Sequence, residues 1–317
     1  MIVILLLSIS VIFAFFAFKK HNLVNPSRHD ICVAYSTDNN YIYPTIVSMT
    51  SIMENANKNT FCKFTVLTAD NVTQEDKEKI KTVSNNYSNC SISIIDMGQQ
   101  FSGSVKGGWS KAMYYRLNLP EILKNEKKCI YLDGDTMIRK DISDMFEIDM
   151  NNYYIAGVRD MNIFINKESS YYNVLGIPNL DSYICSGVLI MNLEKMRNDN
   201  LHEILDKLIT ENDANKTFKF PDQDTLNAAC YGHILALPLK YGALAHIDFS
   251  KSYSESDYAP WASNPKDWDK GSKDPSIIHF TGTKPWLSIY SDFCKNWWDY
   301  AAKTDFKKEI SEKYKIS

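Results

Sequence analysis

The chain has 317 residues, of which 44% are hydrophobic and 23% charged, so it is long and apolar enough to fold as one large domain or as two. An intrinsically disordered chain is excluded, because such chains bury too little apolar surface to offset the entropy that ordering costs. The 35 lysines and arginines are scattered and are balanced by 38 aspartates and glutamates, for a net charge of -3, which predicts no nucleic-acid partner.

The first predicted element is an apolar run over residues 2–18, close to the roughly 20 residues that a bilayer-spanning helix needs. Basic residues follow this run at Lys19 and Lys20 and none precedes it, which favours a signal anchor over a cleaved signal peptide. The same charges predict, by the positive-inside rule, that the rest of the chain lies on the cytoplasmic side. We therefore expect residues 1–20 to anchor the protein in a membrane.

The first half of the chain alternates short β-branched runs with helical patterns. The runs predict strands at 31–36, 64–68, 91–95 and 128–132. The patterns between them predict helices at 43–55, 74–86 and 109–123. This alternation predicts an α/β fold with a doubly wound, mostly parallel central sheet flanked by helices, in which ligands bind outside the carboxyl ends of the strands.

The second half is less regular. It predicts strands at 154–158, 187–192 and 234–238 and helices at 193–212 and 222–230. No internal repeat and no linker rich in Pro, Gly or Ser divides the chain, so we expect one globular domain over residues 30–300. The anchor at 1–20 precedes that domain, and a basic tail at 301–317 follows it.

The seven cysteines include no pair at Cys-x-x-Cys spacing. This excludes a zinc ribbon and a dense disulfide scaffold. Cys32, Cys129 and Cys230 lie inside apolar runs, which predicts small buried side chains in a reducing compartment.

The sharpest local motif is Asp133-Gly134-Asp135, which directly follows the apolar strand at 128–132. Hard divalent cations such as Mg²⁺ and Mn²⁺ are held by one or two carboxylates together with substrate phosphates and water. Gly134 would let a ligand approach the backbone closely. The same triplet is also common in surface turns, so by itself it leaves both interpretations open.

A second motif begins at His279 and includes Gly282 and Lys284. A neutral imidazole can complete a metal site, and a lysine can neutralise a phosphate. A lone histidine is more often structural, but the whole motif favours a site.

Two further stretches are candidates. Asp222 and Gln223 open a predicted helix, where an acidic residue either complements the helix dipole or contacts a polar substrate. Asp38 and Asn40 follow the first strand and either hydrogen-bond a base or form a turn.

Taken together and in this order, these stretches resemble the retaining glycosyltransferases of family 8, which have a GT-A type nucleotide-sugar transferase fold, and among them the bacterial lipopolysaccharide galactosyl- and glucosyltransferases. The resemblance extends over residues 31–298. It implies a UDP-sugar donor, a Mn²⁺ or Mg²⁺ cofactor, and a glycan or glycolipid acceptor.

The resemblance also implies roles for individual residues. The metal ligands would be Asp133, Asp135 and His279, and the residues closest to a catalytic role Asp222 and Gln223. The donor-binding residues would be Ser36, Asp38, Asn40, Arg116, Asp133, Gly134, Asp135, Ser186, Gly187, Gly282 and Lys284. One departure is Cys185, which stands where the family places an asparagine; a thiol is a weaker hydrogen-bond partner than a carboxamide, so the identity of the sugar stays open.

These implications predict transfer of galactose or glucose from a UDP-sugar with retention at the anomeric carbon. Neither Asp222 nor Gln223 is a convincing nucleophile, and a front-face displacement stays open. One alternative is a sugar nucleotidyltransferase, although residues 36–41 lack its glycine-rich, basic phosphate loop. The other is a membrane-tethered, inactive transferase fold that binds glycans, which would have no use for a complete diphosphate site.

Overall fold

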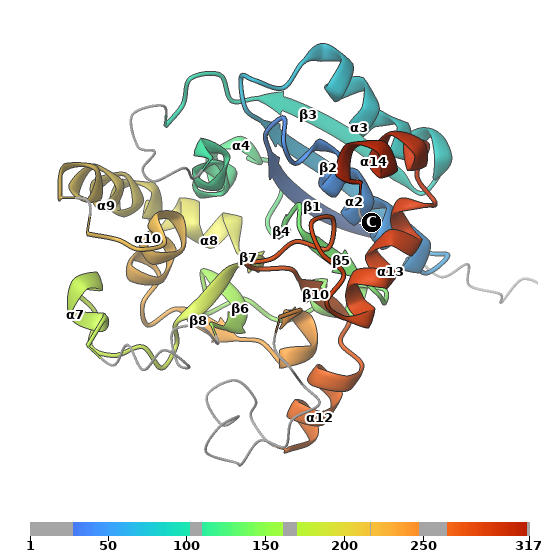
Figure 1. Ribbon diagram of the computed structural model, residues 1–317. Helices are drawn as coiled ribbons and strands as arrows, with labels where there is room; N and C mark the ends of the chain where they lie inside the picture. The colour runs from blue at the N-terminus through green and yellow to red at the C-terminus, as the bar shows by residue number, and fades with distance from the viewer. Residues whose placement is uncertain (1–27, 102–109, 161–169, 216, 247–264, 316–317) are drawn as a thin grey trace, which may run out of the picture.

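The computed structural model describes residues 28–101, 110–160, 170–215, 217–246 and 265–315 (Figure 1). A central sheet of seven strands has the order β3-β2-β1-β4-β7-β6-β8. These strands are β1 (His29–Thr37), β2 (Thr60–Thr68), β3 (Cys90–Asp96), β4 (Cys129–Asp133), β6 (Ile155–Arg159), β7 (Ile184–Met191) and β8 (Ile234–Ala236). Every neighbouring pair is parallel except the two that involve β7, which confirms the predicted mostly parallel sheet.

Helices cover both faces of this sheet, as predicted, because successive residues of a strand point to opposite sides. On β1, Val33 and Tyr35 pack on one side with α2 (Ile42–Asn55) and α3 (Gln74–Asn86). Cys32 and Ala34 pack on the other side. That side is covered by η1 (Lys111–Asn118), α4 (Leu119–Ile122), α8 (Leu193–Asn198), α9 (Leu201–Asn215) and α10 (Pro221–Ala229).

Two predicted helices differ from the structure for local reasons. The helix expected at 109–123 is a 3₁₀ segment followed by one α-helical turn that has Pro120 in its first positions. The helix expected at 193–212 is divided between α8 and α9 at Asn200, whose φ of 52° lies in the left-handed region and interrupts the helix.

A second, smaller sheet lies beside the carboxyl end of β4 and was not predicted. It has the order β5-β10-β9, formed by β5 (Thr136–Ile138), β10 (Ile277–His279) and β9 (Ala243–Leu244). Antiparallel pairing sets His279 opposite Thr136, one residue after Asp135. The small sheet therefore carries a histidine from near the end of the chain to the predicted acidic motif.

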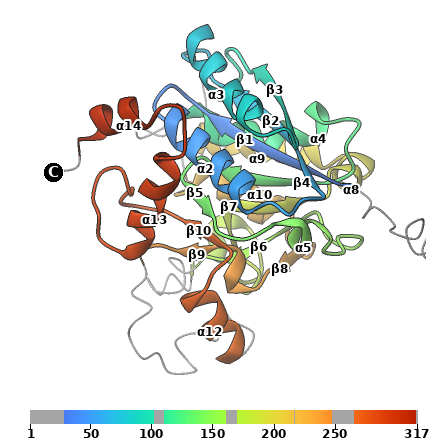
Figure 2. The same ribbon diagram turned by 90° about the vertical axis from the view of Figure 1, so that its right-hand side faces the viewer.

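The remaining elements connect or cover these sheets. They are α5 (Ser143–Phe146), α7 (Tyr172–Leu175), η2 (Leu239–Tyr241), α12 (Pro265–Lys273), α13 (Asp292–Ala301) and α14 (Lys307–Tyr314). Helix α14 lies in the range predicted as a basic tail, and its Ile310 is fully buried in one cluster with Trp297 of α13. Figure 2 shows α13 and α14 lying along the side of the domain near α2.

The predicted membrane localisation needs correction. The longest helix in the described part of the chain has 15 residues, and none there is long and apolar enough to cross a bilayer. The predicted anchor at 1–20 lies outside the described residues.

Candidate functional site

A cavity of about 840 Å³ opens where the strand order reverses, between β1 and β4. Because β7 runs antiparallel to β4, the beginning of β7 lies beside the carboxyl end of β4 and contributes to the same cavity. All of the site residues predicted from the sequence line it. They are Ser36, Asp38, Asn40, Arg116, Asp133, Gly134, Asp135, Ser186, Gly187, Asp222, Gln223, His279, Gly282 and Lys284. Their roles in binding and catalysis stay predictions.

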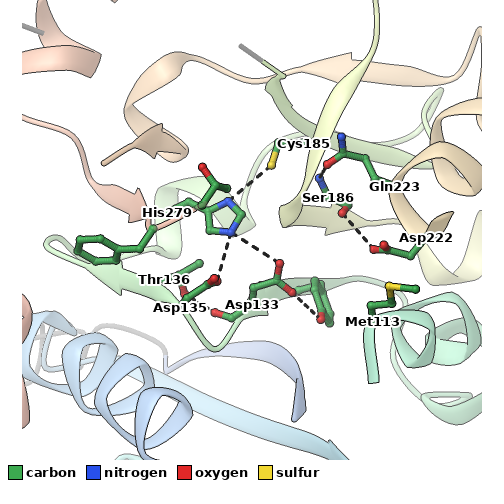
Figure 3. A network of polar contacts seen from close by, with 12 residues as sticks. Met113, Asp133, Asp135, Thr136, Cys185, Ser186, Asp222, Gln223 and His279 are labelled. Atoms are coloured by element: carbon green, nitrogen blue, oxygen red, sulfur yellow. Dashed lines mark hydrogen bonds and ion pairs between the residues drawn. The ribbon is translucent and has the colours of Figure 1, made fainter. Parts of the chain in front are cut away.

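The three predicted metal ligands form a compact group, called here the metal cradle (Asp133, Asp135 and His279). Each offers one ligand atom, and these atoms all lie within 4.8 Å of one another. Nε2 of His279 lies 3.2 Å from Oδ1 of Asp135 and 3.7 Å from Oδ2 of Asp133 (Figure 3). Oδ1 of Asp135 is buried and makes no hydrogen bond to any described residue, which is unusual for a side chain of a residue that is only 6% exposed.

Gly187 on β7 leaves the space beside the metal cradle open. A Cβ atom at this position would lie 2.1 Å from Cε1 of His279 and 2.6 Å from Oδ2 of Asp133. Two carboxylates and an imidazole are donors that Mn²⁺ accepts, and the carboxylates equally suit Mg²⁺. The donor set, the carboxylate oxygen without a hydrogen bond and the open space all fit a divalent cation.

The ionisable groups in and around the metal cradle shift one another's pKa values. Burial alone would raise the pKa of Asp135, but the Lys284 ammonium, with Nζ 2.5 Å from Oδ2, and His279 hold that pKa well below its usual range. Burial alone would lower the pKa of His279, whereas Cys185 and Asp135 hold it well above its usual range. The site therefore stabilises positive charge beside ionised carboxylates.

Arg116 joins three elements beneath the cavity. Its guanidinium donates to Oδ1 of Asp133 at 2.8 Å and to the carbonyl of Ser186 at 2.7 Å, and its Nε lies 3.3 Å from Oδ2 of Asp222. It also lies over the ring of Tyr131, 4.4 Å from the ring centroid. Arg116 is 4% exposed, so these contacts fix β4, β7 and α10 relative to one another.

Gln223 is held on both sides of its amide. Its Oε1 accepts from the backbone N–H of Ser186 at 2.9 Å, and its Nε2 donates to Oδ2 of Asp160 at 2.7 Å and to the hydroxyl of Tyr183 at 3.0 Å. Neighbouring Asp222 accepts from Oγ of Ser186 at 3.2 Å. Burial raises the pKa of Asp222 to about 6, although Arg116 opposes this.

Asp160 lines the cavity and was missed by the sequence analysis. It directly follows strand β6, as Asp133 ends strand β4, and this position was the signal that could have found it. Asp224, the residue after Gln223 in the sequence, is not among the described residues that line the cavity. Its carboxylate instead accepts from the hydroxyls of Tyr171 and Tyr183, both at 2.6 Å.

The end of β1 and the stretch after it also line the cavity, with Ser36 opposite Asp133 in the pairing of β1 with β4. Oδ1 of Asp38 accepts from the backbone N–H of Asn40 at 2.9 Å, which is the turn that the sequence left as an alternative to base contact. Oγ of Ser36 is buried and makes no hydrogen bond within the described residues. Gly282, beside Lys284, has a φ of 72°, a conformation that glycine adopts without strain.

Comparisons with known proteins agree with this geometry. Residues 32–290 match the model of glycosyl transferase family 8. The chain therefore belongs to this family of glycosyltransferases.

Individual relatives give further detail. A lipopolysaccharide 1,2-glucosyltransferase of Escherichia coli is 28% identical over 306 residues, which cover 91% of this chain and 86% of that protein. A protein of Haemophilus influenzae is 32% identical over 206 residues, or 64% of this chain, and this chain spans 60% of its length. The crystal structure of the galactosyltransferase LgtC with donor and acceptor sugar analogs has a TM-score of 0.74 at 20% identity, covers 90% of this chain and 100% of LgtC, and shows that the fold is of the GT-A type.

Proposed function

We propose that this protein is a metal-dependent, retaining glycosyltransferase that transfers galactose or glucose from a UDP-sugar to a hydroxyl of a glycan or glycolipid. The observation that carries the proposal is the metal cradle with Lys284 beside it, at the point where the strand order of the sheet reverses. Membership of glycosyl transferase family 8 supports it independently.

The metal cradle would hold Mn²⁺ or Mg²⁺ through Asp133, Asp135 and His279. Such a cation neutralises charge that develops on the departing UDP. Lys284 lies beside Asp135 and also donates to the carbonyl of Phe280 at 2.8 Å, so its ammonium is fixed before any ligand binds. An ammonium held in this way stabilises negative charge that develops on the diphosphate, and the site does not have to reorganise during the reaction.

Asp222 and Gln223 are better suited to orienting the sugar of the donor than to nucleophilic attack on its anomeric carbon. Both polar atoms of the Gln223 amide already have protein partners, and Asp222 is held by Ser186 and Arg116. We therefore favour a front-face displacement, in which the acceptor oxygen bonds to the anomeric carbon as the bond to the diphosphate breaks. The departing phosphate oxygen then takes the proton of the acceptor hydroxyl.

The acceptor is inferred from the relatives. Two Escherichia coli relatives are named lipopolysaccharide 1,2-glucosyltransferase, and they are 28% and 29% identical to this chain. We therefore propose a lipopolysaccharide-type glycan or glycolipid as the acceptor class.

A thermal-shift titration of the full-length protein with UDP, with and without Mn²⁺, tests the donor site. Ligand at a hundredfold over its dissociation constant adds about 2.7 kcal/mol to the free energy of unfolding. We expect a rise in melting temperature that requires Mn²⁺ and is lost in Asp135→Asn. Asp96→Asn is the matched control, because Asp96 is an exposed residue outside the cavity, at the end of β3, and pairs with Lys77.

Failure of UDP to stabilise the wild type in Mn²⁺ would refute the proposal and favour an inactive transferase fold. Where UDP binds, release of UDP from a panel of UDP-sugars identifies the donor. Each pocket contact contributes about 1–3 kcal/mol to that choice.

A further inference from the structure

Cys185 differs from the other cysteines of the chain. The other six are buried, whereas Cys185 is partly exposed and lines the cavity. Its Sγ lies 3.5 Å from Nδ1 of His279, on the side of the ring that faces away from Asp135 (Figure 3). The thiol therefore contacts the metal cradle without being one of its ligand atoms.

We propose that Cys185 is a positioning residue that sets the ring orientation and tautomer of His279 for metal binding; this inference rests on the proposed function. A neutral imidazole that binds a metal through Nε2 must carry its proton on Nδ1. Within the described residues, Sγ of Cys185 is the hydrogen-bond partner of Nδ1, and in this tautomer Nδ1–H donates to the sulfur. The sulfur thus directs the lone pair of Nε2 toward the two carboxylates.

The geometry of β7 supports this assignment. Residues two apart on a strand point to the same face, so Cys185 and Gly187 both face the ring of His279. Cys185 contacts the ring at Nδ1, and Gly187 leaves the space open beside Nε2 and Cε1. Cys185 therefore holds the Nδ1 edge of the ring, and Gly187, two residues further along the same strand, leaves the Nε2 edge accessible to a ligand.

Asp135 provides a second, independent observation. Its buried Oδ1 makes no hydrogen bond within the described residues and lies 3.2 Å from Nε2 of His279. A buried carboxylate oxygen without a hydrogen bond, this close to an imidazole nitrogen, is placed to share a cation with it. A rotated ring would take Nε2 out of that position, so the contact at Nδ1 controls whether the metal cradle is complete.

The chemistry of sulfur gives the inference a specific consequence. A thiol sulfur is a weak acceptor, whereas a hydroxyl oxygen is a stronger one. Partners of a ligating histidine typically contribute about 10- to 100-fold to metal affinity. Removing the acceptor should therefore weaken metal binding, and replacing sulfur by oxygen should preserve or strengthen it.

The test is Mn²⁺ binding to the full-length protein, followed by the loss of the free-ion EPR signal with and without UDP. We expect Cys185→Val, which is apolar and has no acceptor, to weaken Mn²⁺ binding by about 10- to 100-fold. Cys185→Ser should bind at least as tightly as the wild type. Cys62→Val, in the buried part of β2, is the matched control and should bind normally.

A chemical version of the test avoids substitution. Carboxamidomethylation of the native protein with iodoacetamide should modify Cys185 and lower its Mn²⁺ affinity. The Cys185→Ser variant treated in the same way should be unaffected, because the remaining cysteines are buried.

Two results would overturn the inference: Cys185→Val binding Mn²⁺ with wild-type affinity, or Cys185→Ser binding as weakly as Cys185→Val. His279→Ala separates the inference from the proposed function. Normal Mn²⁺ binding by His279→Ala, or no binding by the wild type, would mean that the metal cradle is not the metal site, and both proposals would fail together.

Discussion

Substituting Gly187 by alanine would fill the metal cradle with a single methyl group. The new Cβ would lie 2.1 Å from Cε1 of His279, whereas non-bonded carbons approach to about 3.5 Å, so the ring must move by about 1.4 Å. The side chain of Asp133 must move as well, because the same Cβ would lie 2.6 Å from its Oδ2. Metal–ligand distances tolerate only about 0.2 Å.

We therefore expect Gly187→Ala to weaken Mn²⁺ binding at least about 100-fold, which corresponds to about 2.8 kcal/mol of binding free energy. The displaced side chains should also lower the free energy of unfolding by about 1–3 kcal/mol. Isothermal calorimetry with Mn²⁺ and urea unfolding measure the two effects separately.

Gly232→Ala is a suitable control for the loss of stability. Gly232 has a φ of 82°, so alanine is strained there, but a Cβ would meet no atom within 4 Å and the residue does not line the cavity. This variant should lose about 1–2 kcal/mol of stability and keep its Mn²⁺ affinity. Wild-type Mn²⁺ affinity in Gly187→Ala would refute the assignment of the open space to a metal ion.

Three further predictions concern the residues around the metal cradle. Arg116→Met should lower the free energy of unfolding by about 3–5 kcal/mol in urea titrations, because it removes the cation that pairs with the buried Asp222 and the partly exposed Asp133; a loss below about 1 kcal/mol, as for an exposed ion pair, would contradict this. Asp222→Asn should be more stable than the wild type by about 3 kcal/mol at pH 8, because a folded-state pKa of about 6 lies above the unfolded value and the ionised carboxylate destabilises the fold above pH 6. That difference should shrink as the pH falls through 6 and vanish near pH 4, and a difference independent of pH in urea unfolding would refute it. Thr136→Val should cost about 1–3 kcal/mol, since it removes the donor to the carbonyl of Asp133 and the partner of Ser48, and an unchanged urea midpoint would exclude this role.

The fold was predictable wherever the local pattern determines the structure. Helix α3 was predicted to the residue, because Thr73 and Asp76 form a reciprocal capping box that fixes its start. The small sheet was not predictable, because strands of two or three residues show no periodicity and pair with distant parts of the chain. Tertiary contacts, not local sequence, decide where β10 lies.

The site was predictable as a set of residues but not as a network. The motifs indicated Arg116, Asp222 and Gln223 separately, and their positions around one cavity follow from the strand ends. The contact of Arg116 with Asp222 joins distant segments, and no local pattern encodes it. Asp160 was missed because a single aspartate after a strand is also typical of an ordinary turn.

The position of β10 also determines when this site can exist during synthesis. The two carboxylates of the metal cradle lie at the end of β4 and two residues further on, in the first half of the chain, whereas His279 and Lys284 come near its end. A ribosome that has synthesised the chain through β8 has supplied all seven strands of the central sheet and Arg116, but neither of the cationic groups beside Asp135. The nascent chain therefore holds every strand of the central sheet before it holds the third residue of the metal cradle, and pairing of β10 with β5 is the step that brings His279 to the two carboxylates near the end of translation.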